Sequence, residues 1–351
     1  VIKNAAQFYG GGSYYGNIYN CSFLQNSNYG SGGGIAYGLA TNCLVLSNSA
    51  SSSGGGAWTA TLKNCRILNN RAGSNGGGAS SSSLYGCLVV SNLASQLGGG
   101  LDSCQTVANC TIIGNYSTQG GGGVNGGAGL ASQNNIIYYN AVTYGTTPNY
   151  SGLPIAYNCC TTPKPTGSVS AFANNITNEP IFVDYTNGNY RLQTNSACIN
   201  SGTGSAATAS DLDGNPRLVD GFLDIGAYEY QTSRYVMPYQ TALYYVLPLD
   251  GAIDSDGDGM NNWQEVIAGT NPTNATSLLK MLSITNSFSG TTVKWQSVFS
   301  KIYYLQRSTN LLVSPAFVSI YTNTPQFLTT LSFKDTTATN GGPYFYRVGV
   351  Q

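Results

Sequence analysis

The strongest sign of chemistry in the sequence is a short run of carboxylates on alternate residues. Asp254, Asp256 and Asp258 alternate with small residues, and Glu265 stands at the twelfth position of the run. Carboxylates at the first, third, fifth and twelfth positions form the calcium-loop pattern D-x-D-x-D-G-x5-E. Gly259 permits the tight turn that this loop requires at its sixth position. The segment therefore predicts a structural calcium site.

Six oxygen-bearing groups are the expected calcium ligands. They are the side chains of Asp254, Asp256, Asp258, Asn262 and Glu265 and the backbone carbonyl of Met260. The alternative interpretation of the same residues is an acidic turn that binds no metal. Only one such loop occurs in the sequence, so we expect a rigid calcium-clamped joint between domains.

Groups that could catalyse a reaction are scarce in the rest of the chain. Histidine is absent, and Asp102 is the only acid up to residue 178. Glycoside hydrolysis requires two carboxylates that flank the scissile bond, and calcium-dependent lyase chemistry requires an acidic site beside a base. The nearest alternative cluster is formed by Asp211, Asp213, Arg217 and Asp224, which we interpret as turn-forming aspartates with a local salt bridge. We therefore predict that the protein is not an enzyme.

The residues before this region repeat with a period of 22, and each unit contains a glycine triplet, an Asn-Cys pair, a short apolar run and a closing asparagine. Self-similarity at a fixed period is typical of repeat architectures. The cysteine column consists of Cys21, Cys43, Cys65, Cys87 and Cys110. The asparagine column consists of Asn26, Asn48, Asn70, Asn92, Asn115 and Asn140.

This unit predicts a parallel β-solenoid that winds once per repeat. Glycine costs about 1 kcal/mol per residue inside a helix, so a triplet in every unit excludes helical repeats. Side chains alternate along a strand, so each cysteine and the apolar residue two positions later face inward. The residue between them is expected to face outward, at Ser22, Leu44, Arg66, Leu88, Thr111 and Ile136. Stacked asparagines can form an amide ladder along the coil.

The cysteines allow more than one interpretation. Those of the column are interpreted as buried thiols that act as small apolar residues, with disulfide bridges or metal binding between rungs as the alternatives. Outside the column, Cys160 and Cys198 are the expected disulfide pair.

The repeats resemble a known family. Gly32–Ile35 and Phe23–Asn26 are similar to the GGAI and FxxN repeats of polymorphic outer-membrane proteins. The resemblance covers residues 1–152 and implies a secreted right-handed parallel β-helix with 22-residue rungs, of the kind that serves as a surface adhesin.

The segment 153–230 is expected to form irregular final rungs and a cap, because a solenoid must close its hydrophobic end. Its sequence at residues 174–184, 211–217 and 224–229 resembles the C-terminal end of choice-of-anchor β-helix proteins. Residues 231–253 are expected to be a linker. Residues 254–275 resemble a bacterial thrombospondin type 3 or dockerin-like calcium repeat. Alternating residues over 279–351 predict a small β-sandwich, which resembles immunoglobulin or fibronectin type III modules.

Composition restricts the partners of the protein. Charged residues make up 8% of the 351 residues and the formal net charge is zero, against about 25% charged residues in an average domain. A neutral chain lacks the basic surface that binds nucleic acid, and no apolar run is long enough to span a bilayer.

Val1–Asn4 aligns with Phe23–Asn26, so the sequence begins within a rung. This indicates a processed chain from which a leader has been removed.

Together these features predict a secreted, non-enzymatic structural protein of the bacterial cell surface. We expect copies of the chain to join head to tail into an extracellular fibre or layer through the open end of the β-helix and the C-terminal β-domain, because an exposed strand edge is a template for pairing. The alternative is a monomeric surface adhesin or carbohydrate-binding protein that recognises surface glycans. A polysaccharide lyase or hydrolase is the weakest of the three hypotheses.

Overall fold

The computed structural model describes residues 1–127, 129–166, 172–204, 206–232, 235–299, 301–324, 329–339 and 342–350. The chain divides into two compact units. The first contains Val1–Ser233 and Pro238–Gln240, and the second contains Arg234–Met237 and Thr241–Gln351.

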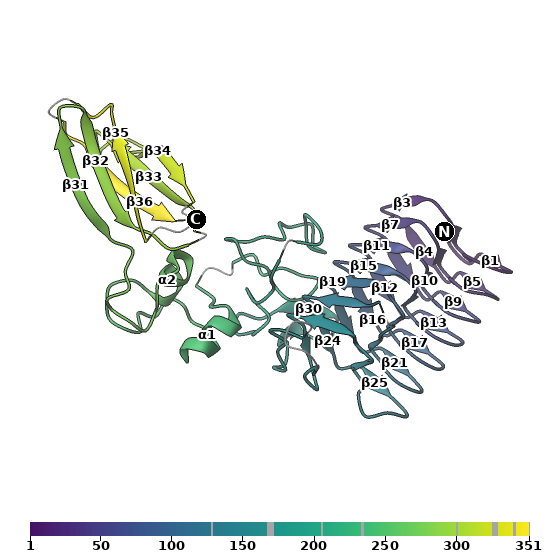
Figure 1. Ribbon diagram of the computed structural model, residues 1–351. Coiled ribbons are helices and arrows are strands. Elements are labelled where there is room, and N and C mark those ends of the chain that lie inside the picture. Colours follow the sequence, from purple (N-terminus) through teal and green to yellow (C-terminus); the bar gives the residue numbers. More distant parts are fainter. Residues whose placement is uncertain are drawn as a thin grey trace. The chain divides into compact units, whose positions relative to one another are not determined.

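The first unit is a parallel β-solenoid of about seven turns, which confirms the predicted fold class. Each turn adds one short strand to each of four seven-stranded sheets, and strands of successive turns lie side by side (Figure 1). Sheet 1 contains β1 Ala5–Ala6, β5 Ser27–Asn28, β9 Ser49–Ala50, β13 Arg71–Ala72, β17 Leu93–Ala94, β21 Tyr116–Ser117 and β25 Ala141–Val142. Sheet 2 contains β2 Ser13–Tyr14, β6 Ile35–Ala36, β10 Ala57–Trp58, β14 Ala79–Ser80, β18 Leu101–Asp102, β22 Val124–Asn125 and β26 Tyr150–Ser151.

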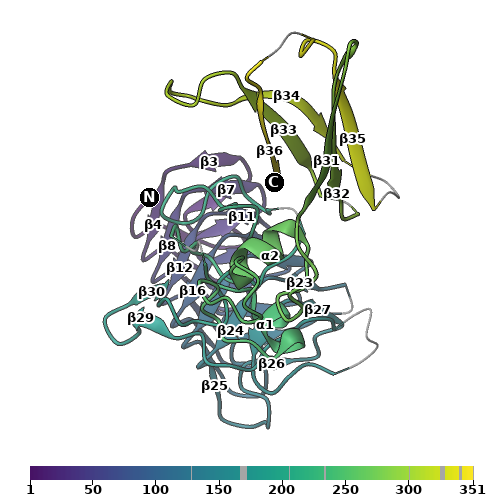
Figure 2. The same ribbon diagram turned by 90° about the vertical axis from the view of Figure 1, so that its left-hand side faces the viewer.

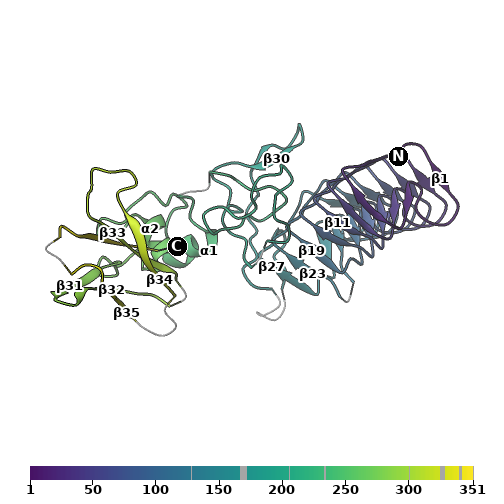
Figure 3. The same ribbon diagram turned by 90° about the horizontal axis from the view of Figure 1, so that it is seen from above.

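The two remaining sheets of the solenoid contain three-residue strands almost throughout, and several of them are visible in Figure 3. Sheet 3 contains β3 Asn17–Tyr19, β7 Leu39–Thr41, β11 Thr61–Lys63, β15 Ser83–Tyr85, β19 Thr106–Ala108, β23 Ala131–Gln133 and β27 Ile155–Tyr157. Sheet 4 contains β4 Ser22–Leu24, β8 Leu44–Leu46, β12 Arg66–Leu68, β16 Leu88–Val90, β20 Thr111–Ile113, β24 Ile136–Tyr138 and β28 Cys160–Thr161. Register is fixed by the repeat, so that Val45 pairs with Phe23 on one side and with Ile67 on the other.

A continuous ladder of asparagine side chains runs through the interior. The amide nitrogen Nδ2 of Asn48 donates to Oδ1 of Asn70 at 3.0 Å, and Nδ2 of Asn70 donates to Oδ1 of Asn92 at 2.9 Å. Asn70 Nδ2 also donates to the carbonyl of Val45 at 2.9 Å, and its Oδ1 accepts the backbone N–H of Asn48 at 2.9 Å. Each amide therefore uses all of its hydrogen-bonding groups, as a buried polar group must.

The ladder ends at a residue that the period does not predict. Asn140 donates from both its backbone nitrogen and its Nδ2 to Oδ1 of Asn149, each at 3.1 Å. The carbonyl of Asn149 lies beside Gly123. Asn149 therefore occupies the place that the third glycine of the next triplet would have. Its own Nδ2 donates to Thr162 O at 2.8 Å. Asn149 thus satisfies the last amide of the column and ends it.

The glycine triplets make room for this ladder. A Cβ on Gly56 would lie 2.5 Å from the carbonyl of Gly78 and 3.0 Å from Cγ of Asn70. The first glycine of the triplet, Gly54, has a φ of 68°, a backbone conformation that favours glycine. The triplet is therefore a consequence of the close approach of successive turns and of the amides packed against them.

The cysteine column also continues beyond its periodic members. The backbone nitrogen of Cys110 donates to Oδ1 of Asn135 at 2.8 Å, and that of Cys159 donates to Oδ1 of Asn175 at 2.8 Å. Asparagine therefore alternates with cysteine in the last turns.

All nine cysteines are free, and Cys21 alone among them is exposed. Burial and a hydrogen bond with Cys110 raise the pKa of Cys87 well above its ordinary value, so this thiol stays neutral.

An asparagine at one corner of most turns has a separate role; it precedes a cysteine except at Asn134, which precedes Asn135. These residues have φ between 48 and 55°: Asn20, Asn42, Asn64, Asn109, Asn134 and Asn158. Asparagine tolerates the left-handed conformation better than most residues other than glycine. The side chains of four of them, Asn64, Asn109, Asn134 and Asn158, bond to a returning segment of the chain.

Residues 199–204 and 206–229 run back along the solenoid and bind this row of corners. Asn134 Nδ2 donates to Thr203 O at 3.0 Å, and Asn134 Oδ1 accepts from Thr203 N at 3.1 Å. Further along, Asn109 Oδ1 accepts from the backbone nitrogen of Ala207 at 3.4 Å, and Asn64 Nδ2 donates to Ser210 O at 3.2 Å.

The returning segment buries part of the face that we expected to be outside. Leu88, Thr111 and Ile136 are 4%, 1% and 1% exposed, whereas Ser22 and Arg66 of the same column are exposed. The prediction was wrong for these three positions, because Ala227 and its neighbours pack on sheet 4 and Ala227 N donates to Thr111 Oγ1 at 2.9 Å. The hairpin β29 Phe182–Asp184 and β30 Asn189–Leu192 adds Tyr190 to this contact (Figure 2). Much of segment 153–230 therefore covers the side of the solenoid.

The second unit contains two antiparallel three-stranded sheets. One has the order β31 Met281–Ser287, β32 Gly290–Gln296 and β35 Thr330–Asp335, and the other β34 Val318–Asn323, β33 Tyr303–Ser308 and β36 Phe345–Val350. Their buried core consists of Val293, Trp295, Tyr303, Leu305 and Leu331. The helices α1 Tyr239–Tyr245 and α2 Asn262–Ala268 have seven residues each, and in the described residues no helix has the length and hydropathy needed to cross a membrane.

We predict that Asn70→Ala lowers the free energy of unfolding of the solenoid by at least about 3 kcal/mol, because buried groups of Asn48, Val45 and Asn92 lose their partners. Urea denaturation followed by circular dichroism measures this loss. The matched control is Asn69→Gly at the exposed neighbour, whose φ of 54° suits glycine. We expect the control to change stability by no more than about 0.5 kcal/mol. Equal losses in the two variants would contradict a structural role of the ladder.

Candidate calcium site

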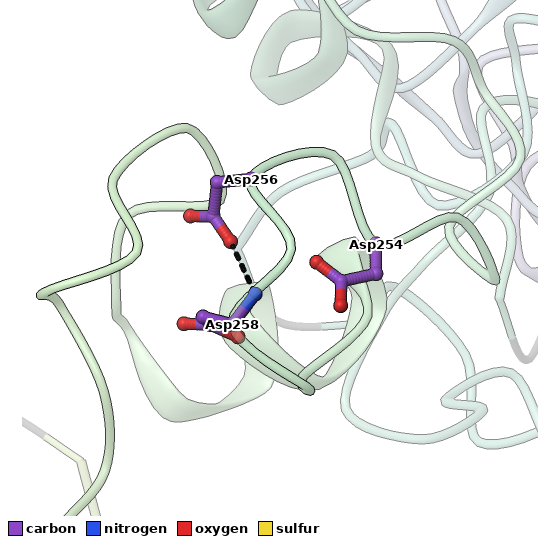
Figure 4. Close-up of side chains that lie close together, drawn as sticks. All are labelled: Asp254, Asp256 and Asp258. Carbon is purple, nitrogen blue, oxygen red and sulfur yellow. Dashed lines mark hydrogen bonds between the residues drawn. The ribbon is translucent and has the colours of Figure 1, made fainter.

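The three aspartates of the predicted loop lie together in the second unit. One carboxylate oxygen from each of Asp254, Asp256 and Asp258 lies within 4.8 Å of the other two (Figure 4). Among the described residues this is the one group of three or more potential metal-ligating side chains. The alternating spacing of the sequence thus brings the carboxylates to one place.

Hydrogen bonds within the loop hold it in a tight turn. Asp254 accepts from the backbone nitrogen of Gly257 at 2.8 Å and from that of Gly259 at 3.0 Å. Gly257 and Gly259 have φ of 78° and 95°, which explains why glycine occupies both positions. These N–H bonds to the carboxylate, that from Gly259 first, lower the pKa of Asp254 and keep it ionised.

Helix α2 carries Glu265, the fourth expected carboxylate ligand, which is not among the three side chains that lie within 4.8 Å of one another. Asn261 caps the helix, with its side chain accepting from Gln264 N at 2.9 Å and Gln264 Oε1 accepting from Asn261 N at 2.9 Å. The reciprocal capping box fixes where the helix begins, and Gly269 ends it in the left-handed conformation. Glu265 therefore lies in the first turn and is fully buried.

The electrostatics of the site favour a cation. Oδ2 of Asp256, Oδ2 of Asp258 and Oε2 of Glu265 are buried and have no hydrogen-bond partner. Desolvation, followed by the charges of Asp256 and Asp258, raises the pKa of Glu265 to about 7. Buried carboxylate oxygens without partners carry a large free-energy cost that a bound cation removes. The residues present therefore fit a calcium ion.

The other two expected ligands are placed differently. Both amide atoms of Asn262 are engaged with Ser255: Oδ1 accepts from Ser255 N at 3.3 Å and Nδ2 donates to Ser255 Oγ at 3.0 Å. Asn262 thus holds the loop against the helix, and its role as an ion ligand stays a prediction. The backbone nitrogen of Met260 donates to Asp258 Oδ1 at 2.7 Å, and ligation by the Met260 carbonyl also stays a prediction.

One supporting contact was missed from the sequence. Thr270 Oγ1 lies 3.3 Å from Glu265 Oε1 and 3.4 Å from Glu265 O, beyond the end of the helix. Thr270 lies outside the twelve-residue pattern, so the sequence does not identify it as a partner of Glu265. It contacts Glu265 because α2 is short and ends at Ala268.

Calcium held by Asp254, Asp256, Asp258 and Glu265 would neutralise these carboxylates and join the loop to α2. The chain's own residues already set the geometry. Gly257 and Gly259 form the turn, and the capping box orients Glu265. The site therefore has the chemistry of a structural ion site.

The second acidic cluster is buried and braces the returning segment. Arg217 is 1% exposed, and its guanidinium donates to the carbonyls of Gly226 and Ala227 at 2.9 and 3.0 Å. Nη1 of Arg217 lies 3.6 Å from Oε2 of Glu229, a residue that the sequence analysis did not include. Asp224 accepts from Asn200 N and Tyr230 N, both at 2.7 Å.

The remaining members of this cluster also have local partners. Asp211 accepts from the backbone nitrogens of Asp213, Asn215 and Glu229. Asp213 lies nearer the surface and forms an ion pair with Arg191 at 2.5 Å. Asp211, Arg217 and Asp224 thus hold backbone segments together, whereas Asp213 pairs with a side chain.

The expected disulfide is not formed. Cys160 and Cys198 are both buried and free, and Sγ of Cys160 donates to Asn178 O at 3.1 Å. Desolvation, followed by a hydrogen bond between the two thiols, raises the pKa of Cys160. The prediction of a disulfide is therefore wrong, and both residues are buried thiols.

Comparison with known proteins identifies one segment. Residues 254–275 match the family model of the bacterial TSP3 repeat, a calcium-binding type of repeat. The match covers the aspartate loop and α2. No curated protein matches the chain.

We predict that Glu265→Gln weakens calcium binding about tenfold or more, because it removes the buried charge that closes the loop. Isothermal titration calorimetry measures the affinity. Calcium should also raise the unfolding temperature of the natural chain, since an ion that binds only the folded state stabilises it. Asp250→Asn, just before the loop, is the control and should bind as the natural chain does. Absence of binding heat in the natural chain would instead favour an acidic turn without a metal.

We also predict that the solenoid unit loses stability as pH rises from about 5 to 9. Desolvation, then the charge of Asp224, raises the pKa of Glu229 to about 9, while desolvation raises that of Asp224 to about 7. In this window the folded state binds more protons than the unfolded chain, so the free energy of unfolding falls with increasing pH. Arg217 lowers both pKa values but does not cancel the shift.

Thermal unfolding at pH 5, 7 and 9 tests this dependence. Glu229→Gln should flatten it, because Oε1 of a glutamine can still accept from the Asp224 nitrogen that Glu229 now binds at 2.8 Å. The control Asp213→Asn, at an exposed pair, should leave the slope unchanged. Asp224 still contributes a slope below pH 7 in this variant, so a slope between pH 7 and 9 that persists in Glu229→Gln would contradict the assignment.

Proposed function

We propose that the protein is a non-enzymatic structural protein of the bacterial cell surface or extracellular space. The observation that carries this proposal is the combination of a solenoid held by an unbroken buried amide ladder with a TSP3 calcium repeat. A solenoid of this kind supplies an extended rigid surface, and calcium is abundant enough outside cells to fill weak structural sites.

The distribution of acids supports a non-enzymatic role. Asp102 is the only acid in the first 178 residues and is 5% exposed. Its carboxylate accepts from Asn125 Nδ2 at 2.7 Å, and Ser80 Oγ lies 3.4 Å away. A single buried acid without a histidine cannot form the paired groups that glycoside hydrolysis requires.

The finer part of the proposal is self-assembly of the chain into a fibre or layer. Strand β31 is at the edge of its sheet, and all seven of its residues are exposed. Met281, Leu282 and Ile284 are 39%, 46% and 52% exposed. An apolar edge strand of this length is a template for pairing with another chain, and a contact that does not close on itself produces a filament.

A second candidate function, surface adhesion through glycan binding, is favoured by a different observation. Five aromatic rings gather on the outside of the solenoid near β2, β6 and β10. Assembly and adhesion are compatible with one another, and each depends on a different unit of the chain.

We predict that the natural chain forms concentration-dependent oligomers in calcium, and that Leu282→Lys with Ile284→Lys abolishes them. Charges on an edge strand oppose strand addition. Light scattering and negative-stain electron microscopy, with calcium and then with a chelator, measure assembly. Leu312→Lys, at a residue 95% exposed in a turn, is the control. Monomers at every concentration in both conditions would contradict self-assembly.

A further inference from the structure

An aromatic cluster lies on the outer face of sheet 2. We define it by five residues: Tyr9, Tyr14, Tyr15, Tyr37 and Trp58. Tyr9, Tyr14 and Tyr15 are 43%, 53% and 57% exposed, and Tyr37 and Trp58 are partly exposed. The inward columns of the solenoid do not include these rings, so the hydrophobic core does not account for them.

The rings form two stacks that meet nearly at right angles. Tyr9 lies between Tyr14 and Trp58, with ring centroids 6.0 and 5.1 Å away and interplanar angles of 17° and 6°. Tyr15 and Tyr37 stack at 4.6 Å and 7°. Tyr37 meets Tyr14 at 86° and Trp58 at 77°. Contacts of this kind hold side chains in fixed positions and add about 0.5–1.5 kcal/mol each.

Register explains the first stack. Tyr14 pairs with Ala36 and Ala36 pairs with Trp58, so a small residue separates two large ones on the same face. The ring of Tyr9 occupies the space above Ala36. The surface is therefore preorganised, since each ring is supported by another.

The surroundings of the aromatic cluster are uncharged. No Asp, Glu, Lys or Arg occurs between Lys3 and Lys63. Farther along the same column, Ser80, Asp102 and Asn125 follow in register after Trp58. Ser80 and Asp102 are buried at 3% and 5% exposure, so the partly exposed Asn125 is the amide that the surface offers beyond the aromatic cluster.

This chemistry selects among possible ligands. Nucleic acids and anionic membranes require lysine and arginine, which this face lacks. Aromatic rings with polar edges, beside a few placed hydrogen-bonding groups, suit a ligand that has apolar C–H faces and many hydroxyl groups. Pyranose rings have this character.

We propose that this face binds a neutral polysaccharide. Sugar rings pack on the aromatic cluster, and sugar hydroxyls bond to the tyrosine hydroxyls of the cluster and to the partly exposed Asn125. The proposal gives a ligand class to the adhesion function above, on which it rests, and it is independent of assembly through β31.

Intrinsic fluorescence tests the proposal on the full chain. The chain has three tryptophans, and Trp263 and Trp295 are 4% and 0% exposed. Trp58 therefore reports iodide quenching almost alone. Titrations with cello-, chito- and manno-oligosaccharides, after a screen on an array of neutral glycans, should show saturable protection of Trp58. Polygalacturonate serves as the anionic comparison and should give none.

Two variants locate the site. Tyr9→Ala removes the ring between the two others and should weaken binding about tenfold or more. Tyr15→Ala removes a more exposed ring, so it tests the surface even if Tyr9→Ala lowers stability. The matched control is Tyr29→Ala, at a tyrosine that is 78% exposed and outside the aromatic cluster. Unchanged binding is expected there.

Several outcomes would overturn the proposal. They are no protection by any neutral glycan on the array, tighter binding of polygalacturonate, or equal binding by the natural chain, Tyr9→Ala and Tyr15→Ala. Protection that depends on protein concentration without glycan would assign the face to contacts between copies instead. Sedimentation of the Leu282→Lys, Ile284→Lys variant separates the two hypotheses, because glycan binding should survive when assembly through β31 is lost.

Discussion

The buried asparagine amide is the interaction on which the solenoid depends. A side-chain amide has two donors and an oxygen that accepts twice, and Asn70 uses all of them on Asn48, Asn92 and Val45. Such a group is costly to bury unless every bond is made. A shift of one residue in any turn would leave these groups unpaired and would turn inward-facing side chains outward. The amides therefore fix the register of the turns as well as contributing stability. Glycine triplets are required because the asparagine side chains and the next turn lie too close to them for a Cβ.

The features that the sequence predicted are those in which the same chemistry recurs at a constant spacing. The inward cysteine and the apolar residue after it repeat because each occupies the same place in successive turns. Asn135, Asn149 and Asn175 perform the same backbone bonding but stand outside the period, because loops of different length precede them. Burial of Leu88, Thr111 and Ile136 could not be predicted either, since it results from a segment about a hundred residues later in the chain.

The two acidic clusters show the same division between local and distant order. The aspartate loop was predictable because its ligands lie within twelve residues, where alternation and two glycines determine the turn. What the pattern could not supply was the use of the Asn262 amide on Ser255, which depends on how α2 packs. In the other cluster, the residue types predicted a salt bridge. The folded chain shows that the carboxylate paired with Arg217 is that of Glu229, which the sequence did not indicate.

An interior that repeats leaves the exterior free to vary. Inward positions hold Cys, Asn and apolar residues in turn after turn, whereas the outward column of sheet 2 reads Tyr14, Ala36, Trp58, Ser80 and Asp102. Since the amide ladder and the core already determine the fold, nothing in the architecture requires aromatic rings at the first and third of these positions. Rings exposed to water without a packing role cost hydrophobic free energy that burial in a complex would recover. The proposed binding of a polysaccharide would account for the aromatic cluster, which the hydrophobic core does not require.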